Sequence, residues 1–181
     1  GPLGSGWTHS YQIRIIDLGG IAIVKWGNGR DDLYAYNGTA YTPAPGVYNL
    51  LQKTFGSYIL TTKDKTIYTF ASLPLGAPED GLFVGRLVEI KDRNGIELEL
   101  VYDDVKEGLL DHVIDGSNRT YQFQYIQVAG DPSHLISESN RYRLNQITEE
   151  NAGGLNRSIG FGYDVMSRLT SYTDAEGNIT T

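Results

Sequence analysis

The chain contains no cysteine and only three histidines among its 181 residues. Without cysteine it has no disulfide framework, no thiolate metal site and no cysteine nucleophile. The histidines, His9, His112 and His134, are far apart and match neither an HxH nor an HExxH spacing, so a zinc site would need long-range convergence. We therefore predict no metal and no cofactor. The lack of cysteine fits a cytosolic protein and an exported bacterial protein equally well.

Basic clusters and long apolar runs are also missing. The formal net charge is −7, and no run of Lys and Arg occurs. Nucleic-acid binding needs clustered cations that release counterions from the phosphates, so we expect no nucleic-acid partner. The longest apolar run, 21–24, is far shorter than the roughly 18 residues of a membrane-spanning helix, so we expect no membrane span.

The motifs of common enzyme classes are absent as well. The sequence contains no Gly-x-Ser-x-Gly elbow, no P-loop and no dinucleotide-binding fingerprint. Adjacent carboxylates such as Asp103 and Asp104 would point to opposite faces of a strand, so they cannot act together as a catalytic pair. The acidic turns that begin at Asp92 and Asp174 lack the downstream glutamate of an EF-hand loop, so turn formation explains them better than calcium binding. We predict that the chain is not an enzyme.

What the chain does contain is a composition suited to strands and turns. It has 13 Tyr and 22 Gly but one Met, and 40% of its residues are hydrophobic, as in an ordinary globular domain. Apolar and polar residues alternate over 11–15, 96–102, 121–125 and 158–163. This period of two is typical of strands that bury one face.

Turn-forming pairs separate the alternating segments. They are Asn28-Gly29, Asn37-Gly38, Asn94-Gly95, Asp115-Gly116 and Gly177-Asn178. Such pairs readily supply the positive φ of tight hairpin turns. Prolines in 42–46 and 74–81 exclude central strands there. The sequence therefore predicts an all-β fold of antiparallel hairpin repeats stacked into a curved or spiralling sheet, with little or no helix.

The chain divides into three parts on composition. Residues 1–5 have the sequence that a protease leaves when it removes an affinity tag, so they are excluded from fold prediction. A proline-rich and glycine-rich stretch ends near Leu82 and marks a soft boundary. We predict an N-terminal β segment over 6–81 and about 3.5 hairpin repeats over 82–181, interrupted by an irregular insert near 129–140.

Four segments of the second half are similar to one another. Their recurring leucines are roughly two dozen residues apart, except where the insert lengthens the second unit, and that length fits two strands and two turns. Because an isolated hairpin is marginally stable in water, each unit must gain stability from its neighbours. The residues that carry the repeat are Gly85, Arg86, Leu87, Asp92, Asn94, Gly95, Tyr102, Asp103, Leu110, Asp115, Gly116, Tyr125, Leu144, Tyr163, Asp164, Arg168, Leu169, Asp174 and Gly177.

These segments resemble the YD-repeat, or Rhs-repeat, family, whose units open with Gly-Arg-Leu, continue with an aspartate and an Asn-Gly-type turn, and close with Tyr-x-Tyr-Asp. The resemblance is clearest over 85–103 and 163–178. The second unit departs from the pattern because Tyr125 is followed by Ile126, and the third lacks the opening glycine. Four earlier segments resemble the region that often precedes such repeats, namely 26–29, 46–48, 61–64 and 68–70.

The resemblance implies a long β-sheet, which in complete members spirals into a hollow shell around a polymorphic toxin or another C-terminal passenger. Members occur in bacterial Rhs and wall-associated toxins, in insecticidal toxin complexes and in animal teneurins. We therefore expect a structural repeat module of a large secreted or cell-surface bacterial protein. Its partners would be the further repeats and the passenger of the parent chain. The family's self-cleaving core has no match in this segment.

Binding is the alternative function. The tyrosines, together with Trp7 and Trp26, are numerous enough to form a flat aromatic platform on which the rings of carbohydrates or cell-surface glycans stack. Against this, alternating aromatic residues in repeats first of all fill the core. Burial of the tyrosine rows would separate the two hypotheses.

The C-terminal segment predicts a further type of contact. The sequence ends at Thr181, where the fourth unit would turn back into its closing strand. We expect residues 168–173 to lack their hairpin partner and to offer an open sheet edge for self-association.

Overall fold

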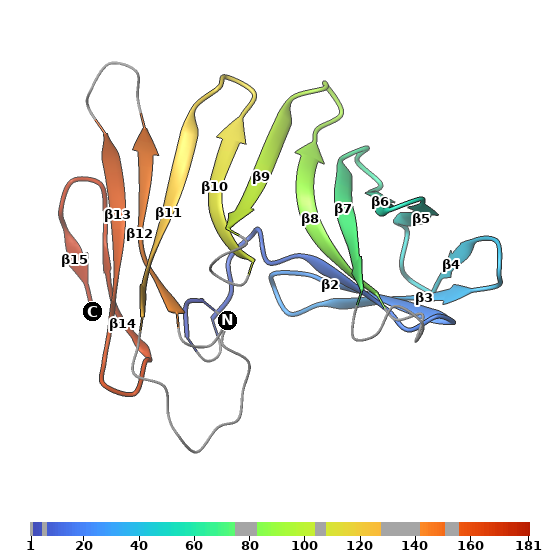
Figure 1. Cartoon of the computed structure of the whole chain (residues 1–181), viewed down its shortest axis with the longest axis horizontal. Coiled ribbons are helices and arrows are strands. Elements are labelled where there is room, and N and C mark those ends of the chain that lie inside the picture. The colour runs from blue at the N-terminus through green and yellow to red at the C-terminus, as the bar shows by residue number, and fades with distance from the viewer. Residues whose placement is uncertain (1, 5–6, 75–82, 104–107, 128–141, 151–155) are drawn as a thin grey trace. The chain divides into compact units, whose positions relative to one another are not determined.

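The computed structural model describes residues 2–4, 7–74, 83–103, 108–127, 142–150 and 156–181 (Figure 1). These residues form fifteen β-strands, all their pairs are antiparallel, and no helix occurs among them. The predicted all-β hairpin fold is confirmed. The predicted insert near 129–140 lies outside the described residues.

The chain forms two compact units. The N-terminal unit is His9–Glu99, and the C-terminal unit is Leu100–Thr181 together with Gly1–Thr8. The units meet along the chain within β9 (Glu97–Asp103), which is further on than the predicted boundary near Leu82.

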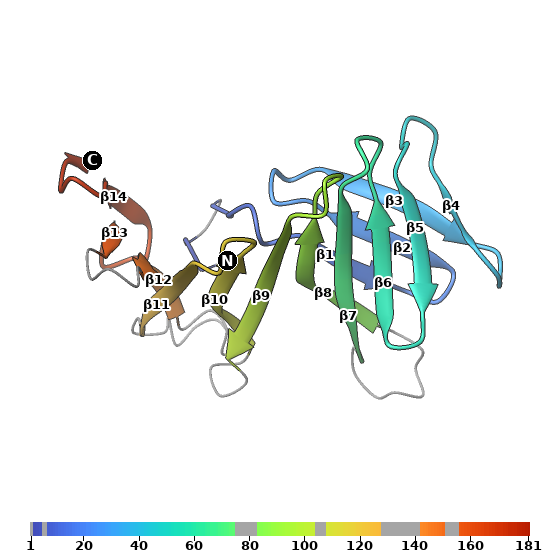
Figure 2. The ribbon, with the colours of Figure 1, turned by 90° about the horizontal axis from the view of Figure 1, so that it is seen from above.

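The N-terminal unit is a two-layered arrangement of strands. Its strands are β1 (Arg14–Asp17), β2 (Ile21–Lys25), β3 (Asp31–Tyr36), β4 (Tyr41–Pro43), β5 (Leu50–Thr54), β6 (Ser57–Thr61), β7 (Ile67–Pro74) and β8 (Phe83–Lys91). The strand order is β8-β1-β2-β3-β4 in one direction, and β7, β6 and β5 follow on the other side of β8. Figure 2 shows β5 to β8 side by side across from β2 and β3.

Strand β8 changes partners halfway along its length. In its first half Gly85 pairs with Ile15 of β1, and in its second half Ile90 pairs with Leu98 of β9. On its other side β7 pairs along the whole strand, with a register shift after Thr69. Such a bulge bends the strand and increases its twist, which allows the two halves to face different neighbours.

The core of the N-terminal unit lies between its two layers. The largest side chains with less than 2% exposure there are Tyr34, Tyr58, Phe70, Ile15, Leu51, Leu60, Leu87 and Val24. They come from strands that alternate buried and exposed positions, as in the eBiB pattern of β1. Each such apolar side chain contributes about 1.5–3 kcal/mol when it is fully buried.

A buried carboxylate connects the two layers. Asp17, at the end of β1, is 1% exposed and accepts hydrogen bonds from the Tyr41 hydroxyl at 2.7 Å, the Tyr58 hydroxyl at 2.8 Å and Lys53 Nζ at 2.8 Å. The backbone NH of Gly19 donates a further bond at 3.0 Å. Burial alone would raise the pKa of Asp17, but these donors outweigh it and hold the pKa below its usual value.

The C-terminal unit is a series of hairpins in which each strand pairs with the next. After β9 come β10 (Leu109–Asp115), β11 (Thr120–Gln127), β12 (Tyr142–Glu150), β13 (Arg157–Tyr163), β14 (Leu169–Thr173) and β15 (Ile179–Thr180). Its buried strand residues are Leu100, Leu110, Val113, Phe123 and Leu144.

Residues 2–4, which were excluded from the prediction, pack against the C-terminal unit. The Pro2 carbonyl accepts a hydrogen bond from the backbone NH of Leu144 at 2.7 Å. Leu3 is 7% exposed. These residues therefore cover part of the sheet that contains β12.

Most of the predicted turns are confirmed, because Gly29, Gly38, Gly95 and Gly177 have positive φ. The prediction for Asp115-Gly116 is wrong in detail, since the positive φ of that turn lies at Asn118. The turn begins at Asp115 and closes at Arg119, and the left-handed position is the one just before the closing residue, which is Asn118 and not Gly116.

The prediction that residues 168–173 lack a hairpin partner also needs correction. Strand β14 pairs with β13 over its length, where Phe161 lies opposite Tyr172. The turn that follows β14 brings the chain back, so that Thr173 pairs with Ile179. Only the first residues of β14 have no described strand on the β15 side.

Candidate functional site

The aspartates of the repeat pattern begin turns that share one hydrogen-bond pattern. In the turn 92–96 the backbone NH of Asp92 donates to the Ile96 carbonyl at 2.9 Å, and the Gly95 NH donates to the Asp92 carbonyl at 3.1 Å. Oδ1 of Asp92 accepts from the backbone NH of Asn94 at 2.7 Å and of Ile96 at 2.9 Å. The same bonds recur in the turns that begin at Asp115, Asp164 and Asp174.

These turns lower the pKa of each aspartate carboxyl. Hydrogen bonds from the closing residue of each turn are the main cause that holds the pKa of the four aspartates below the usual value. In two turns the closing residue is an arginine, whose Nε donates to the same aspartate at 2.7 Å, Arg119 to Asp115 and Arg168 to Asp164. This explains the arginine of the repeat pattern at 168.

The position before the closing residue always has positive φ. It holds Gly95 at +87°, Asn118 at +60°, Ser167 at +58° and Gly177 at +88°. Because Asn or Ser tolerates the left-handed conformation at some cost, this position of the repeat can vary in sequence while the turn keeps its shape.

The tyrosines that close the repeat units bond to the leucines that open them. The Tyr125 hydroxyl donates to the Leu110 carbonyl at 2.8 Å, and the Tyr163 hydroxyl donates to the Leu144 carbonyl at 2.7 Å. Burial raises the pKa of Tyr163 to about 12. Burial, followed by the neighbouring Tyr102, also raises the pKa of Tyr125. The tyrosines are therefore neutral donors inside the unit.

The remaining residues of the predicted repeat lie in several different places. Gly85, Arg86 and Leu87 are in β8 within the N-terminal unit. A Cβ on Gly85 would come within 3.0 Å of Ile15 Cβ, so this glycine allows close packing. Tyr102 and Asp103 end β9, Gly116 is in the turn after β10, and Leu169 begins β14.

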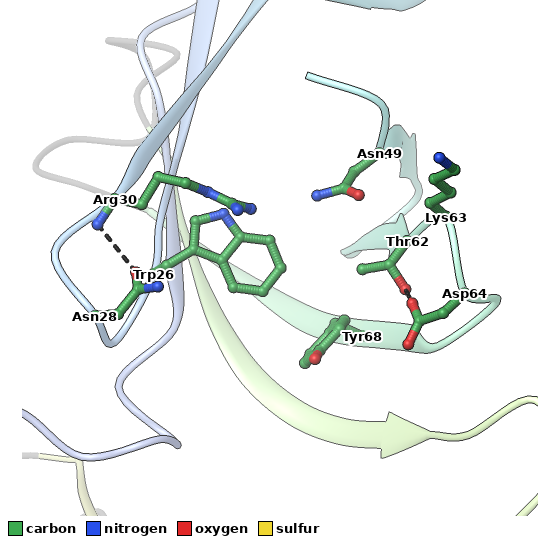
Figure 3. A pocket seen from close by; sticks show the side chains of 8 residues that line it. All are labelled: Trp26, Asn28, Arg30, Asn49, Thr62, Lys63, Asp64 and Tyr68. Carbon is green, nitrogen blue, oxygen red and sulfur yellow. Dashed lines mark hydrogen bonds between the residues drawn. The ribbon is translucent and has the colours of Figure 1, made fainter. Parts of the chain in front are cut away.

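A different kind of site lies in the N-terminal unit, where an open cleft of about 690 Å³ is formed by loops (Figure 3). Trp26, Asn28 and Arg30 come from the turn between β2 and β3. Asn49 immediately precedes β5, and the turn between β6 and β7 supplies Thr62, Lys63 and Asp64. Tyr68 of β7 completes the lining. Figure 3 shows Trp26 and Arg30 across the cleft from Asn49, Thr62 and Asp64.

The aromatic side of the cleft is held firmly in place. The Trp26 and Tyr68 rings meet edge to face, with centroids 5.6 Å apart and planes at 88°. Trp26 Nε1 donates to Asp32 Oδ2 at 2.7 Å, and the Arg30 guanidinium bonds to the same oxygen at 2.8 Å. The guanidinium carbon of Arg30 lies 4.7 Å from the centroid of the Trp26 ring. These contacts fix the orientation of the indole.

The polar side carries groups of both charges. The Thr62 hydroxyl donates to Oδ1 of Asp64, and the Thr66 hydroxyl donates to its Oδ2 at 3.2 Å. These donors, Thr62 first, hold the pKa of Asp64 below its usual value. Burial, and then the charge of Asp64, raises the pKa of Tyr68. Lys63 Nζ lies 5.7 Å from the ring centroid of Tyr48.

The sequence marks most of these residues but does not predict that they line one cleft. Segments 26–29, 61–64 and 68–70 carry the family resemblance, Trp26 is also a candidate for an aromatic carbohydrate platform, and Asn28-Gly29 is a predicted turn, whereas no pattern marks Arg30 and Asn49. The turns 26–30 and 62–66 make the same two backbone hydrogen bonds as the aspartate turns. This shared turn geometry is the signal that could have pointed to the loops of the cleft. Trp26 and Thr62 occupy the position that aspartate holds in the repeats.

No metal-binding cluster accompanies these sites in the part of the chain that the structure describes. There, no group of three or more His, Asp or Glu side chains is close enough to hold a metal ion. Over the same residues, no helix has the length and apolar character needed to cross a membrane.

Comparisons with known proteins add little. No protein-family model matches the sequence, and no curated protein matches it. Among solved structures, a porin-like protein from Bacteroides uniformis is similar over 91% of this chain and 89% of its own, with 10% sequence identity and a TM-score of 0.31. A similarity at that level carries no argument about fold or function.

Proposed function

We propose that this chain is a structural repeat module of a large secreted or cell-surface bacterial protein, in which it forms part of a β-shell around a C-terminal passenger. The observation that supports the proposal is the recurrence of one turn geometry at Asp92, Asp115, Asp164 and Asp174. The tyrosine-to-leucine bonds recur with it. Turns and hydrogen bonds that recur in this way suit a sheet that grows by adding hairpins, because each hairpin offers its free edge to the next.

A duplicated repeat tests the extension step in this chain. Residues 144–168 would be inserted a second time directly after residue 168, which keeps the spacing from one leucine to the next. If the unit is a repeat, the longer chain unfolds in one transition with a higher midpoint and a larger denaturant m-value. A matched control carries Asp164→Ala in the inserted copy only, and it should lose most of the gain. A separate, less stable transition for the insert would contradict the proposal.

Electron microscopy of the parent protein tests the shell. The proposal expects the sheet of this segment to continue into further hairpins whose inner face encloses the downstream passenger. Limited proteolysis of the same sample should then leave the passenger intact at protease concentrations that digest it alone. An image of separate, flexibly linked domains, or a passenger that is cut at the same rate in both forms, would rule the shell out.

The tyrosine rows give less support to the alternative function, a flat aromatic platform that binds carbohydrate. Tyr34, Tyr41 and Tyr58 are buried in the N-terminal unit, and Tyr125 and Tyr163 use their hydroxyls inside the C-terminal unit. The aromatic residues of the cleft, Trp26 and Tyr68, do not belong to these tyrosine rows.

A further inference from the structure

We propose that the cleft around Trp26 and Tyr68 binds a short neutral saccharide, about two or three pyranose rings long. The cleft lies wholly within His9–Glu99, so this inference does not rest on the role of the repeats. Three features support it: a fixed aromatic wall, polar groups with unused hydrogen-bonding capacity, and charges that balance.

The aromatic wall is already ordered by contacts within the protein. The C–H faces of pyranose rings pack on aromatic rings, and Trp offers the largest such surface among the side chains. Arg30 and Asp32 hold the indole from one side, and Tyr68 contacts it edge to face. Because binding need not order these groups, little free energy is lost to immobilising them.

Polar groups on both sides of the cleft offer donors and acceptors for hydroxyl groups. Asn28 accepts the Arg30 backbone NH through Oδ1, which leaves its Nδ2 hydrogens for a ligand. Neither the side-chain amide of Asn49 nor the Tyr68 hydroxyl has a hydrogen-bond partner among the described residues. An amide donates and accepts at once, which suits a hydroxyl that does the same.

The charges in the cleft favour a neutral ligand. Arg30 is paired with Asp32 at 2.8 Å, and Lys63 is next to Asp64 in the same turn. A phosphate or sulfate group would meet the Asp64 carboxylate, and a cation would meet Lys63. The volume of about 690 Å³ falls in the range of small-molecule sites, roughly 300–1,000 Å³.

Tryptophan fluorescence tests the proposal in the whole chain. Trp7→Phe removes the other indole, so that Trp26 becomes the only reporter. The probes are chitotriose, cellotriose and maltotriose, each titrated to about 10 mM, with inorganic phosphate and 3′-sialyllactose as anionic comparisons. We expect saturable quenching or a spectral shift with at least one neutral trisaccharide. Amide NMR shifts confined to 26–30, 49 and 62–68 would locate the site independently.

Variants decide whether binding occurs in the cleft. Asn49→Ala and Tyr68→Ala should each weaken binding at least tenfold. Their matched controls, Asn94→Ala and Tyr172→Ala, are outside the cleft and should bind as the parent does. Circular dichroism checks that all four variants keep the parent's β spectrum.

Three outcomes would overturn the proposal. The first is the absence of a saturable response to every neutral trisaccharide by both fluorescence and NMR. The second is equal binding by the parent and Asn49→Ala. The third is a response to phosphate or 3′-sialyllactose alone, which would make the cleft an anion site. None of these results bears on the repeat proposal, which is measured by unfolding and microscopy.

Discussion

The two units of this chain are stable for different reasons. The N-terminal unit hides large side chains such as Tyr34, Tyr58 and Phe70 completely between two layers, together with the carboxylate of Asp17. In the C-terminal unit most strand residues are only partly buried, and the recurring geometry lies in the turns and in the tyrosine-to-carbonyl bonds. Substitutions should therefore act through packing and buried charge in the core of the first unit, and through backbone conformation in the recurring turns, of which 92–96 belongs to the first unit.

The largest effect is expected at Asp17. Asp17→Asn keeps the size of the side chain but leaves Lys53 and two tyrosine hydroxyls without the charge they bond to. Breaking a buried ion pair in this way costs about 3–5 kcal/mol. Chemical denaturation of the variant measures the loss, with Asp31→Asn as a control because the Lys25–Asp31 pair is on the surface. Equal stability of the two variants would show that the layers do not depend on this carboxylate.

The same carboxylate should make the N-terminal unit sensitive to acid. Its pKa is lower in the folded state than the ordinary value of 3.8, so its contribution is fully present above that value and is lost as the pH falls through the folded pKa. The stability difference between the parent and Asp17→Asn should therefore be constant from pH 7 to about pH 5 and shrink below about pH 4. Thermal melts across this range measure it, and a difference that is independent of pH would refute the assignment.

A smaller effect is expected at Gly85, where packing rather than charge is decisive. A Cβ here would lie 3.0 Å from Ile15 Cβ and 3.1 Å from Phe70 Cβ. Gly85→Ala should cost about 1–3 kcal/mol, because an already filled core must shift. Gly20→Ala is the matched control, since nothing lies within 4 Å of a Cβ at that position. If the two variants have the same melting temperature, the layers at β8 are packed less closely than these distances indicate.

In the turns the backbone decides the outcome. Gly95 has a φ of +87° and open space around its Cα, so any cost of substitution there comes from conformation alone. Gly95→Val should cost about 1–3 kcal/mol. Gly95→Asn should cost clearly less, because Asn118 holds the equivalent position at a φ of +60°. Denaturation midpoints of the pair test this, and the ranking Asn worse than Val would contradict the shared turn geometry.

The smallest effect is expected for a single tyrosine hydroxyl. Tyr163→Phe removes the bond to the Leu144 carbonyl and should cost about 1 kcal/mol. Tyr172→Phe is the control, because no described hydrogen bond uses its hydroxyl. Hydrogen exchange of the β12 and β13 amides should rise in the first variant and stay unchanged in the second.

Sequence reasoning reached the all-β hairpin fold because strand alternation and turn residues are local signals. The turn at Gly95 followed from two adjacent residues. In contrast, the position of positive φ in the Asp115 turn was predicted wrongly, because an asparagine, Asn118, adopts it in place of a glycine. The buried Asp17 network joins residues up to 41 positions apart, and no local pattern marks such a contact. The cleft was missed for the same reason, since its walls come from three separate loops.

Strand β8 has a consequence for the order of folding. In the C-terminal unit partners are near in sequence, as with Val113 and Tyr121. The pairing of Ile15 with Gly85 instead closes a loop of 70 positions. Because closing long loops costs chain entropy before any contact forms, rates fall as partners become more distant in sequence. We expect the C-terminal hairpins to form first and the β1–β8 pairing to complete the N-terminal unit last, as the rate-limiting step.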